Sequence, residues 1–413
     1  MRKDRILKAR SLRNPWAAAL AVLCLLAATR FSGAARSDDP NALLPGEKEQ
    51  GFVSLFNGRD LSGWTIDRSE VKSFVVSDGA IQCTGAGDYE TILRTEQMYE
   101  NFELHLEYMT PGWCEGGVLF HVSPVGRATR MGAKIQIYHK VGEKTEPTVT
   151  GSIFGVLAPP KDMAKPAKQW NDLRVLMDWP RLRVELNGEM LHDVNVDKIE
   201  DLKYRERTGY IALQDIGSRP SFRRIRIRTL APKDKWESMF NGRDFTGWRE
   251  ADKSGWEVND GVIHASNGTG YQISDKQYKD FELKATIRTS PRSNGGIFFR
   301  WRREETKDKD RGYEAQIRNS PDASHPTGSL YEIERARDDE IAHENEWFLM
   351  HIIAQGPHIV IRVDGKTVSE VRDATKLEAG HIALQMHSQN SWVEFKDIKI
   401  RELPPEGSVP STR

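Results

Sequence analysis

The 413-residue sequence predicts an all-β protein made of two copies of one sandwich or barrel domain. Three observations lead to this fold class. Eight segments recur in the same order, short runs alternate polar and apolar residues with period two, and turn signals separate these runs at regular spacing. No convincing amphipathic helix pattern interrupts the strands, so any helix should be a short turn, near residues 198–202 or 340–345.

The internal repeat defines the domains. LFNGRDLSGW at 55–64 returns as MFNGRDFTGW at 239–248, and EGGVLFHV at 115–122 returns as NGGIFFRW at 294–301. Two copies of this length indicate two domains rather than a solenoid of small repeats. We predict copy one at residues 47–231, copy two at residues 232–403, and a disordered tail at 404–413.

Strand and turn patterns recur inside each copy. In the segment 101–108, apolar Phe102, Leu104 and Leu106 alternate with charged residues or histidine, as expected of a half-buried strand. Asn187-Gly188 and Asp364-Gly365 each follow an apolar alternation, which is the signature of a tight hairpin.

The first 35 residues have the pattern of a secretory signal peptide. Six basic residues lie between positions 2 and 13, an apolar run covers 17–28, and small residues at 32–35 suit cleavage. The apolar run is short for a membrane span, although an uncleaved N-terminal anchor is the alternative. We therefore expect an exported protein, periplasmic or extracellular, with no membrane attachment after cleavage.

Charge and cysteine content argue against two classes of protein, nucleic-acid binders and disulfide-rich scaffolds. Lys plus Arg and Asp plus Glu both number 60, so the net charge is zero. A nucleic-acid binder driven by counterion release needs a basic surface, and we expect no such partner. Cys83 and Cys114 remain after the leader, too few for a disulfide scaffold, and they either pair or stay buried as free thiols.

The combined motif order resembles one bacterial family. LFNGRDLSGW, GG-hydrophobic-F, TGS and G-x-IALQ, in that order, resemble the 3-keto-disaccharide hydrolase domain family, also described as 3-keto-glucoside lyase and hydratase proteins. The resemblance covers residues of about 50–230 and 236–403. It implies two tandem concanavalin A-like jelly-roll sandwiches and an exported enzyme that cleaves 3-keto-glycosides, by hydrolysis or by elimination and hydration. The alternatives are a lectin-like carbohydrate-binding protein without catalysis, or a structural pair that forms one composite surface.

The implied chemistry requires three kinds of group. A ketone at C3 of the sugar acidifies the C2 proton, so a base can remove it and the C1 oxygen can leave by β-elimination. The site needs that base, a cation or hydrogen-bond donors for the enolate oxygen, and an acid for the leaving group.

The family resemblance points to the strand Gly-Tyr-Glu-Ala-Gln at 312–316 of copy two. Alternation places Glu314 and Gln316 on one face of this strand, where a solvated surface is the plain alternative. We predict Glu314 as the base, His387 as an acid or base, and Arg300 as the positive charge beside the enolate. Further substrate contacts in copy two are predicted at Gln316, Asn294, Tyr313 and Trp301.

Copy one departs from this pattern. Lys134 takes the place of the glutamate, and the simplest expectation is a salt-bridged lysine on the surface. Of the family's Asp-His-Gly, copy one keeps the acid and loses the histidine, whereas copy two loses the acid and keeps the histidine. Sugar contacts in copy one are predicted at Gln136, His121, Glu115, Trp113 and Asp215.

The tryptophans fall into two groups, and no residue pattern assigns a metal site. Tryptophans that recur in both copies are expected to anchor the cores: Trp64, Trp170, Trp248 and Trp347. Trp113 and Trp301 occur in one copy each and are better suited to stacking on a pyranose ring. No dense acidic loop suggests calcium, so no cofactor is certain, and a divalent metal with unknown ligands stays open.

Overall fold

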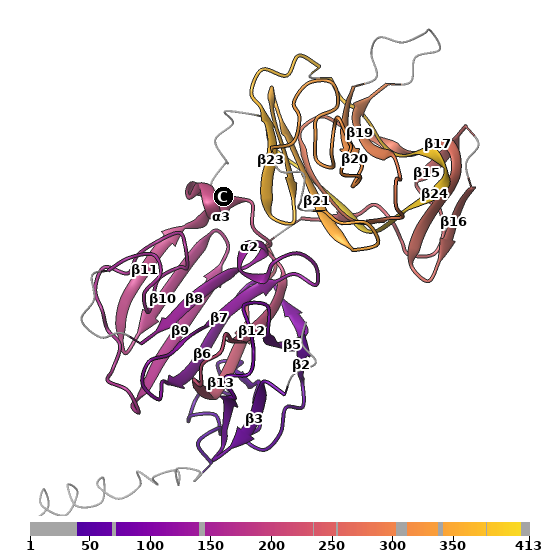
Figure 1. Ribbon diagram of the computed structural model, residues 1–413. Coiled ribbons are helices and arrows are strands. Elements are labelled where there is room, and N and C mark those ends of the chain that lie inside the picture. Colours follow the sequence, from indigo (N-terminus) through magenta and orange to yellow (C-terminus); the bar gives the residue numbers. More distant parts are fainter. Residues whose placement is uncertain are drawn as a thin grey trace, which may run out of the picture.

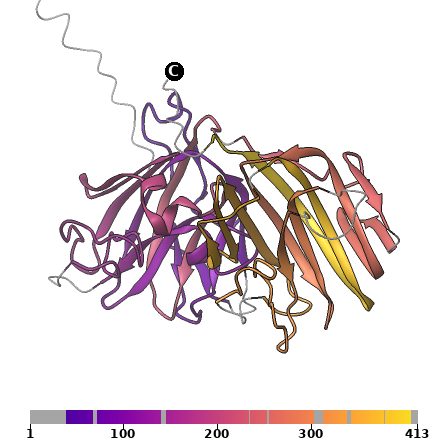
Figure 2. The same ribbon diagram turned by 90° about the horizontal axis from the view of Figure 1, so that it is seen from above.

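The computed structural model describes residues 39–67, 72–139, 145–233, 235–252, 255–302, 312–337, 342–376 and 378–405. The predicted leader and residues 406–413 of the predicted tail lie outside these ranges. The described chain folds into two β-rich halves that lie side by side, copy one in indigo to magenta and copy two in orange to yellow (Figure 1 and Figure 2). Each half consists of two antiparallel sheets around its own core, which confirms the all-β prediction of two sandwiches in tandem.

Copy one contains an eight-stranded and a five-stranded sheet. The larger sheet has the order β11-β10-β9-β6-β13-β4-β3, with β1 beside β13. Its strands are β1 Val53–Ser54, β3 Phe74–Ser77, β4 Ala80–Cys83, β6 Phe102–Met109, β9 Trp170–Asp178, β10 Arg181–Leu186, β11 Glu189–Asn195 and β13 Ser221–Thr229. The smaller sheet has the order β2-β5-β12-β7-β8, with β2 Trp64–Asp67, β5 Ile92–Tyr99, β7 Glu115–Val122, β8 Ala133–Tyr138 and β12 Gly209–Asp215.

Copy two repeats this arrangement, except that two long strands, β17 Val262–Tyr278 and β24 Gly380–Glu402, run through both of its sheets and join them into one continuous sheet of eleven strands. One sheet joins parts of β17 and β24 to β14 Glu237–Ser238, β16 Gly255–Asn259, β18 Phe281–Thr289, β21 Phe348–Gln355, β22 His358–Val363 and β23 Lys366–Val371. The other joins the remaining parts to β15 Trp248–Ala251, β19 Gly295–Trp301 and β20 Tyr313–Ile317. Its order, β15-β17-β24-β19-β20, matches β2-β5-β12-β7-β8 of copy one, as expected of a duplication.

Period-two alternation explains how the cores form. Leu104 and Leu106 of β6 are buried between the sheets, while Glu103 and Glu107 point outward to arginines of β13. Trp64 and Trp248 are also buried, and each indole N–H donates to a main-chain oxygen at 2.6 Å. These two tryptophans are the predicted core anchors.

Several local predictions are resolved by the structure. Trp170 and Trp347 are not core anchors, because they are half-buried under the cations of Arg223 at 4.0 Å and Lys396 at 4.1 Å. A helical turn does form near residue 200, as η1 Val196–Lys198 and α3 Glu200–Lys203, while α2 Ala128–Met131 was not predicted. Residues 342–345 form no helix, and the described cysteines, Cys83 and Cys114, are buried free thiols.

A buried cluster of charged groups joins the two copies. Glu206, in the segment after α3, accepts a hydrogen bond from Lys284 of β18 at 2.8 Å, and their side chains are 8% and 2% exposed. Burial alone would raise the pKa of Glu206, but the ammonium groups of Lys284 and Lys399 outweigh burial and hold this pKa at about 2. The indole of Trp236 lies 5.0 Å from the Lys284 ammonium and shields it from water.

Replacing Glu206 with Gln should lower the free energy of unfolding by about 3–5 kcal/mol, because Lys284 would be left buried without the carboxylate that it pairs with. Urea denaturation followed by tryptophan fluorescence measures this change. Glu189→Gln, which removes the exposed partner of Lys161, is the matched control and should leave the midpoint unchanged. Equal midpoints for Glu206→Gln and the control would contradict the importance of the buried pair.

Candidate functional site

Equivalent sheets of the two copies each bear a cavity on the face turned away from the core. In copy two the cavity has a volume of about 630 Å3 and lies over β17, β19, β20 and β24. In copy one it has a volume of about 680 Å3 and lies over β7 and β8. The equivalent strand pairs β19–β20 and β7–β8 therefore contribute to both cavities, and the side chains on them decide what each cavity can do.

The floor of the copy-two cavity is built by alternation along β20. Ala315 and Ile317 enter the core, while Glu314 and Gln316 line the cavity. Tyr313 also borders the cavity, and its hydroxyl accepts a hydrogen bond from the Lys376 backbone N–H at 2.8 Å. The predicted placement of the carboxylate and the amide on one face is what the structure has.

Gly296 on the neighbouring strand β19 provides the space for Glu314. A Cβ atom at Gly296 would overlap Oε1 of Glu314 and would lie 2.8 Å from its Cγ. Because real Cβ atoms essentially never approach so closely, any other residue here would displace the carboxylate. The glycine thus lets Glu314 lie against the sheet.

A polar rim surrounds this carboxylate. Gln316 Nε2 donates to Asn294 Oδ1 at 2.6 Å, and Gln385 Nε2 donates to the Tyr271 hydroxyl at 3.3 Å. His387 is exposed at the edge of the cavity, with its backbone N–H bonded to the carbonyl of Asn294 at 2.9 Å. Five predicted residues therefore share one cavity: Asn294, Tyr313, Glu314, Gln316 and His387.

Arg300 does not fill the predicted position beside the reacting sugar. Its side chain is fully buried, donates to the carbonyls of Lys279 at 2.8 Å and Gly356 at 2.9 Å, and pairs with Asp280 at 3.1 Å. These contacts occupy the guanidinium, which holds three segments of the chain together. The prediction of a cation for an enolate is wrong for this residue.

Trp301 is also placed differently from the prediction. It is only 3% exposed and stacks on Tyr271 with ring centroids 5.2 Å apart. Tyr271, not Trp301, borders the cavity. Trp301 therefore supports an aromatic wall from beneath instead of offering its own face to a sugar.

The lining residues of copy two that the sequence predictions missed include Tyr271, Tyr331, Lys376 and Gln385. Two of them had a signal, because Tyr331 lies in the repeated segment TGSLYEI and Gln385 in the repeated segment IALQ. Lys376 comes from a loop before β24, where no local pattern marks it. Its ammonium donates to the carbonyl of Gly312 at 3.0 Å, two residues before Glu314 in the chain.

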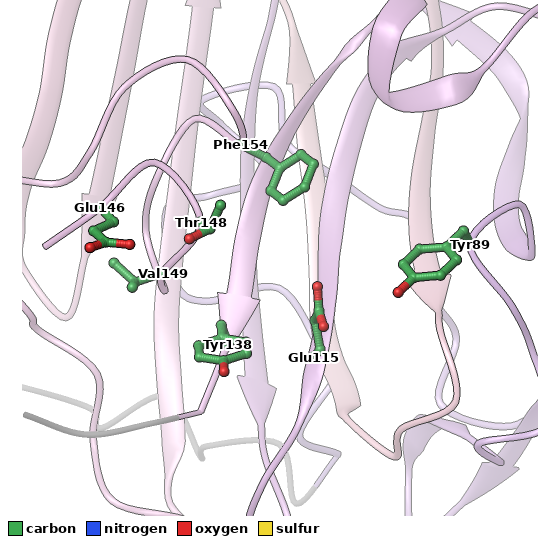
Figure 3. A pocket seen from close by; sticks show the side chains of 7 residues that line it. All are labelled: Tyr89, Glu115, Tyr138, Glu146, Thr148, Val149 and Phe154. Atoms are coloured by element: carbon green, nitrogen blue, oxygen red, sulfur yellow. The ribbon is translucent and has the colours of Figure 1, made fainter. Parts of the chain in front are cut away.

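Of the residues predicted to contact sugar in copy one, only Glu115 lines its cavity. Glu115 lines the cavity, as Figure 3 shows, and accepts a hydrogen bond from the buried Gln136 at 3.3 Å. Trp113 is 64% exposed but does not line the cavity. His121 is buried and bonded to the carbonyl of Glu100 at 2.7 Å, so it is not available to a sugar.

Asp215 and Lys134 correct two further predictions for copy one. Asp215 is fully buried and accepts from the backbone N–H groups of Gly85 and Gly217, both at 3.1 Å, so it orders loops and does not face the cavity. Lys134 is not a surface lysine, because it is 3% exposed and its ammonium lies 4.5 Å from the Phe154 ring centre. Burial lowers the pKa of Lys134 to about 8, against the opposing effect of Glu115.

Two features of the described residues bear on metal binding and on membrane spanning. Among the residues that the structure describes, His, Cys, Asp and Glu side chains form no group of three or more suited to hold a metal ion. In the same part of the chain, no helix is both long and apolar enough to cross a membrane.

The model of the 3-keto-alpha-glucoside-1,2-lyase-like domain matches the chain twice, at residues 51–228 and 235–401. The chain belongs to this family. The family and its distant relatives indicate a carbohydrate-active, hydrolase-like protein, in agreement with the family resemblance in the sequence. The two matches cover both sandwiches, so both cavities lie within the family's domain.

Individual relatives are distant. A 3-keto-disaccharide hydrolase of Bacteroides thetaiotaomicron is 26% identical over 191 residues, which are 38% of this chain and 66% of the relative, so the match falls just short of two thirds of that protein. A putative glycosyl hydrolase from Parabacteroides distasonis has 26% identity and a TM-score of 0.41, covering 46% of this chain and 99% of that one. The carbohydrate-binding module CBM66 from Bacillus subtilis has 18% identity and a TM-score of 0.30, covering 40% and 100%.

The structural role of Arg300 can be tested directly. Arg300→Met should lower the free energy of unfolding by about 3–5 kcal/mol, since Asp280 would be left buried without its cationic partner. Thermal and urea unfolding of the full chain measure this loss. Arg302→Met removes a half-exposed arginine two residues away and should change stability much less. An Arg300→Met protein as stable as the unmodified chain would contradict this structural role.

Proposed function

We propose that copy two cleaves glycosides whose pyranose ring carries a ketone at C3. The observation that carries the proposal is the Glu314 carboxylate, which lines a cavity together with the Gln316 amide, His387 and Lys376. A base, a hydrogen-bonding amide, a histidine and a cation are the groups that an elimination at C1 and C2 requires. Family membership supports the same chemistry.

The reaction uses Glu314 as the base. The carboxylate takes the C2 proton, the C2–H electrons form the enolate with C3, and the enolate then re-forms the ketone as the C1–O bond breaks. The leaving oxygen takes a proton from His387, whose ring stands at the exposed edge where an aglycone can depart. Water adds across the resulting C1–C2 double bond, with OH at C1 and H at C2, so the net change is hydrolysis.

Lys376 takes the role first assigned to Arg300. Its ammonium is held by the Gly312 carbonyl, and Lys376 borders the same cavity as Glu314. A positive charge in a partly enclosed site stabilises a developing enolate far better than it would in water. Tyr271 and Tyr331 supply aromatic surfaces on which the apolar face of a pyranose can rest.

Sugar binding without turnover is the second candidate for this cavity. The half-exposed ring of Tyr331, at 40%, together with amide and carboxylate oxygens, would also suit a lectin-like site. The two functions differ in what Glu314 does, because a lectin needs it only as a hydrogen-bond acceptor.

Glu314→Gln should reduce turnover at least 100-fold, as expected for loss of a general base, while sugar binding changes little. Release of free sugar from 3-keto-trehalose and 3-keto-lactose measures turnover, and calorimetry with the same sugars measures binding. Glu250→Gln, which changes an exposed carboxylate on β15 at the opposite edge of the same sheet, is the matched control. Full turnover in Glu314→Gln, or saturable binding with no turnover by the unmodified protein, would refute the catalytic proposal.

We also propose that the protein is exported and that its leader is removed. The basic residues followed by a twelve-residue apolar run and small residues support this. Expression of the full chain in a bacterial host, fractionation, and N-terminal sequencing test it. The expected product lies outside the cytoplasm and begins close to residue 36, whereas an intact Met1 on a cytoplasmic product would contradict export.

A further inference from the structure

The copy-one cavity has the floor of a sugar site without the groups for catalysis. Lys134 stands where copy two has Glu314, and Ile216 stands where copy two has His387. Neither Lys134 nor Ile216 lines the cavity. The strand glutamine is nevertheless retained, because Gln136 donates to Glu115 as Gln316 donates to Asn294 in copy two, with a carboxylate in place of the amide.

Lys134 supports a wall of this cavity. Gly117 clears space for the lysine as Gly296 does for Glu314, since an added Cβ would lie 2.5 Å from Lys134 Cε. The lysine extends under Phe154, and its ammonium lies 4.5 Å from the ring centre. A cation against the ring face holds Phe154 in place, and Phe154 borders the cavity.

The loop between β4 and β5 brings an aromatic side chain to the cavity of copy one. Copy two has the unbroken strand β17, whereas copy one leaves the sheet between β4 and β5 and forms the loop 84–91. Asp215 holds this loop through Gly85 N–H, and Gln214 holds it through the Tyr89 carbonyl at 2.8 Å. As a result the Tyr89 side chain, 67% exposed, borders the cavity.

The side chains around the opening have the chemistry of a sugar site. Figure 3 shows the Glu115 carboxylate between Tyr89 on one side and Tyr138 on the other, with the Phe154 ring above it. Aromatic faces suit the C–H face of a pyranose, and a carboxylate accepts hydrogen bonds from sugar hydroxyls. Glu115 and Glu146 are the charged groups among the described lining residues, which disfavours uronates and sulfated sugars.

We propose that copy one is a non-catalytic binding site for a neutral pyranoside, with Tyr89 and Phe154 as stacking surfaces and Glu115 as the hydroxyl acceptor. One chain then holds two sugars at separate places, one of them without cleaving it. The proposal goes beyond the chemistry proposed for copy two and does not depend on it.

Calorimetry on the full chain tests this site with trehalose and lactose as neutral probes and glucuronate as the anionic probe. Tyr331→Ala is introduced first to weaken binding in copy two. In this background, trehalose or lactose should still bind, and Tyr89→Ala should weaken that binding roughly tenfold, or about 1.4 kcal/mol. Glu115→Gln should also weaken it, and glucuronate should bind less well than the neutral sugars.

Controls separate this proposal from the function of copy two. Met190→Ala, an exposed apolar side chain on β11 away from the cavity, should leave binding unchanged. Tyr89→Ala in the otherwise unmodified chain should leave turnover of 3-keto-trehalose unchanged, whereas lost turnover would show that copy one is not a passive site. No binding of either neutral sugar, or binding that neither Tyr89→Ala nor Glu115→Gln weakens, would overturn the proposal. Failure of the unmodified chain to turn over keto sugars would refute the function of copy two without affecting this titration.

Discussion

The missing side chain at Gly296 is the constraint on which the copy-two site depends. Strands β19 and β20 are hydrogen-bonded neighbours, and the carboxylate of Glu314 lies across the place that a Cβ of Gly296 would take. The base can therefore lie close to the sheet with a cavity above it. Copy one has the same opening at Gly117 but places a lysine in it. The duplication has thus kept the space and changed the group that occupies it.

This single exchange accounts for the different characters proposed for the two cavities. A carboxylate in the opening faces the cavity and serves as a base, whereas Lys134 passes under Phe154 and braces an aromatic wall. The sandwiches themselves are joined by the buried pair of Glu206 and Lys284. Because breaking such a pair leaves a buried charge unpaired, the contact favours one arrangement of the two copies.

The repeat and the strand alternation were enough to predict the fold class and the side of β20 that bears Glu314 and Gln316. These predictions succeed because a side-chain period of two is a property of the local backbone. Arg300 was assigned from its charge and its position at the end of a strand, and there the alternation breaks down. The register between β19 and β24 shifts between Phe298 and Trp301, and Arg300 adopts a positive φ of 48°, so alternation no longer gives the direction of its side chain.

Other parts of the site depend on contacts between distant segments. The burial of Lys134 requires Phe154 from a later loop, and Lys376 reaches the cavity from more than 60 residues beyond Glu314. Neither placement has a local signal in the sequence. Asp215 was mistaken for a sugar ligand because its motif is shared with the family, although its carboxylate is fully used by backbone N–H groups.

A direct comparison of two alanine substitutions tests the central claim. Turnover of 3-keto-trehalose is measured for Gly296→Ala and Gly117→Ala, with circular dichroism and unfolding midpoints to establish that both variants are folded. If the space beside Glu314 is what makes copy two a catalyst, Gly296→Ala loses most of its turnover and Gly117→Ala retains it. A folded Gly296→Ala protein with the turnover of the unmodified chain would contradict the account.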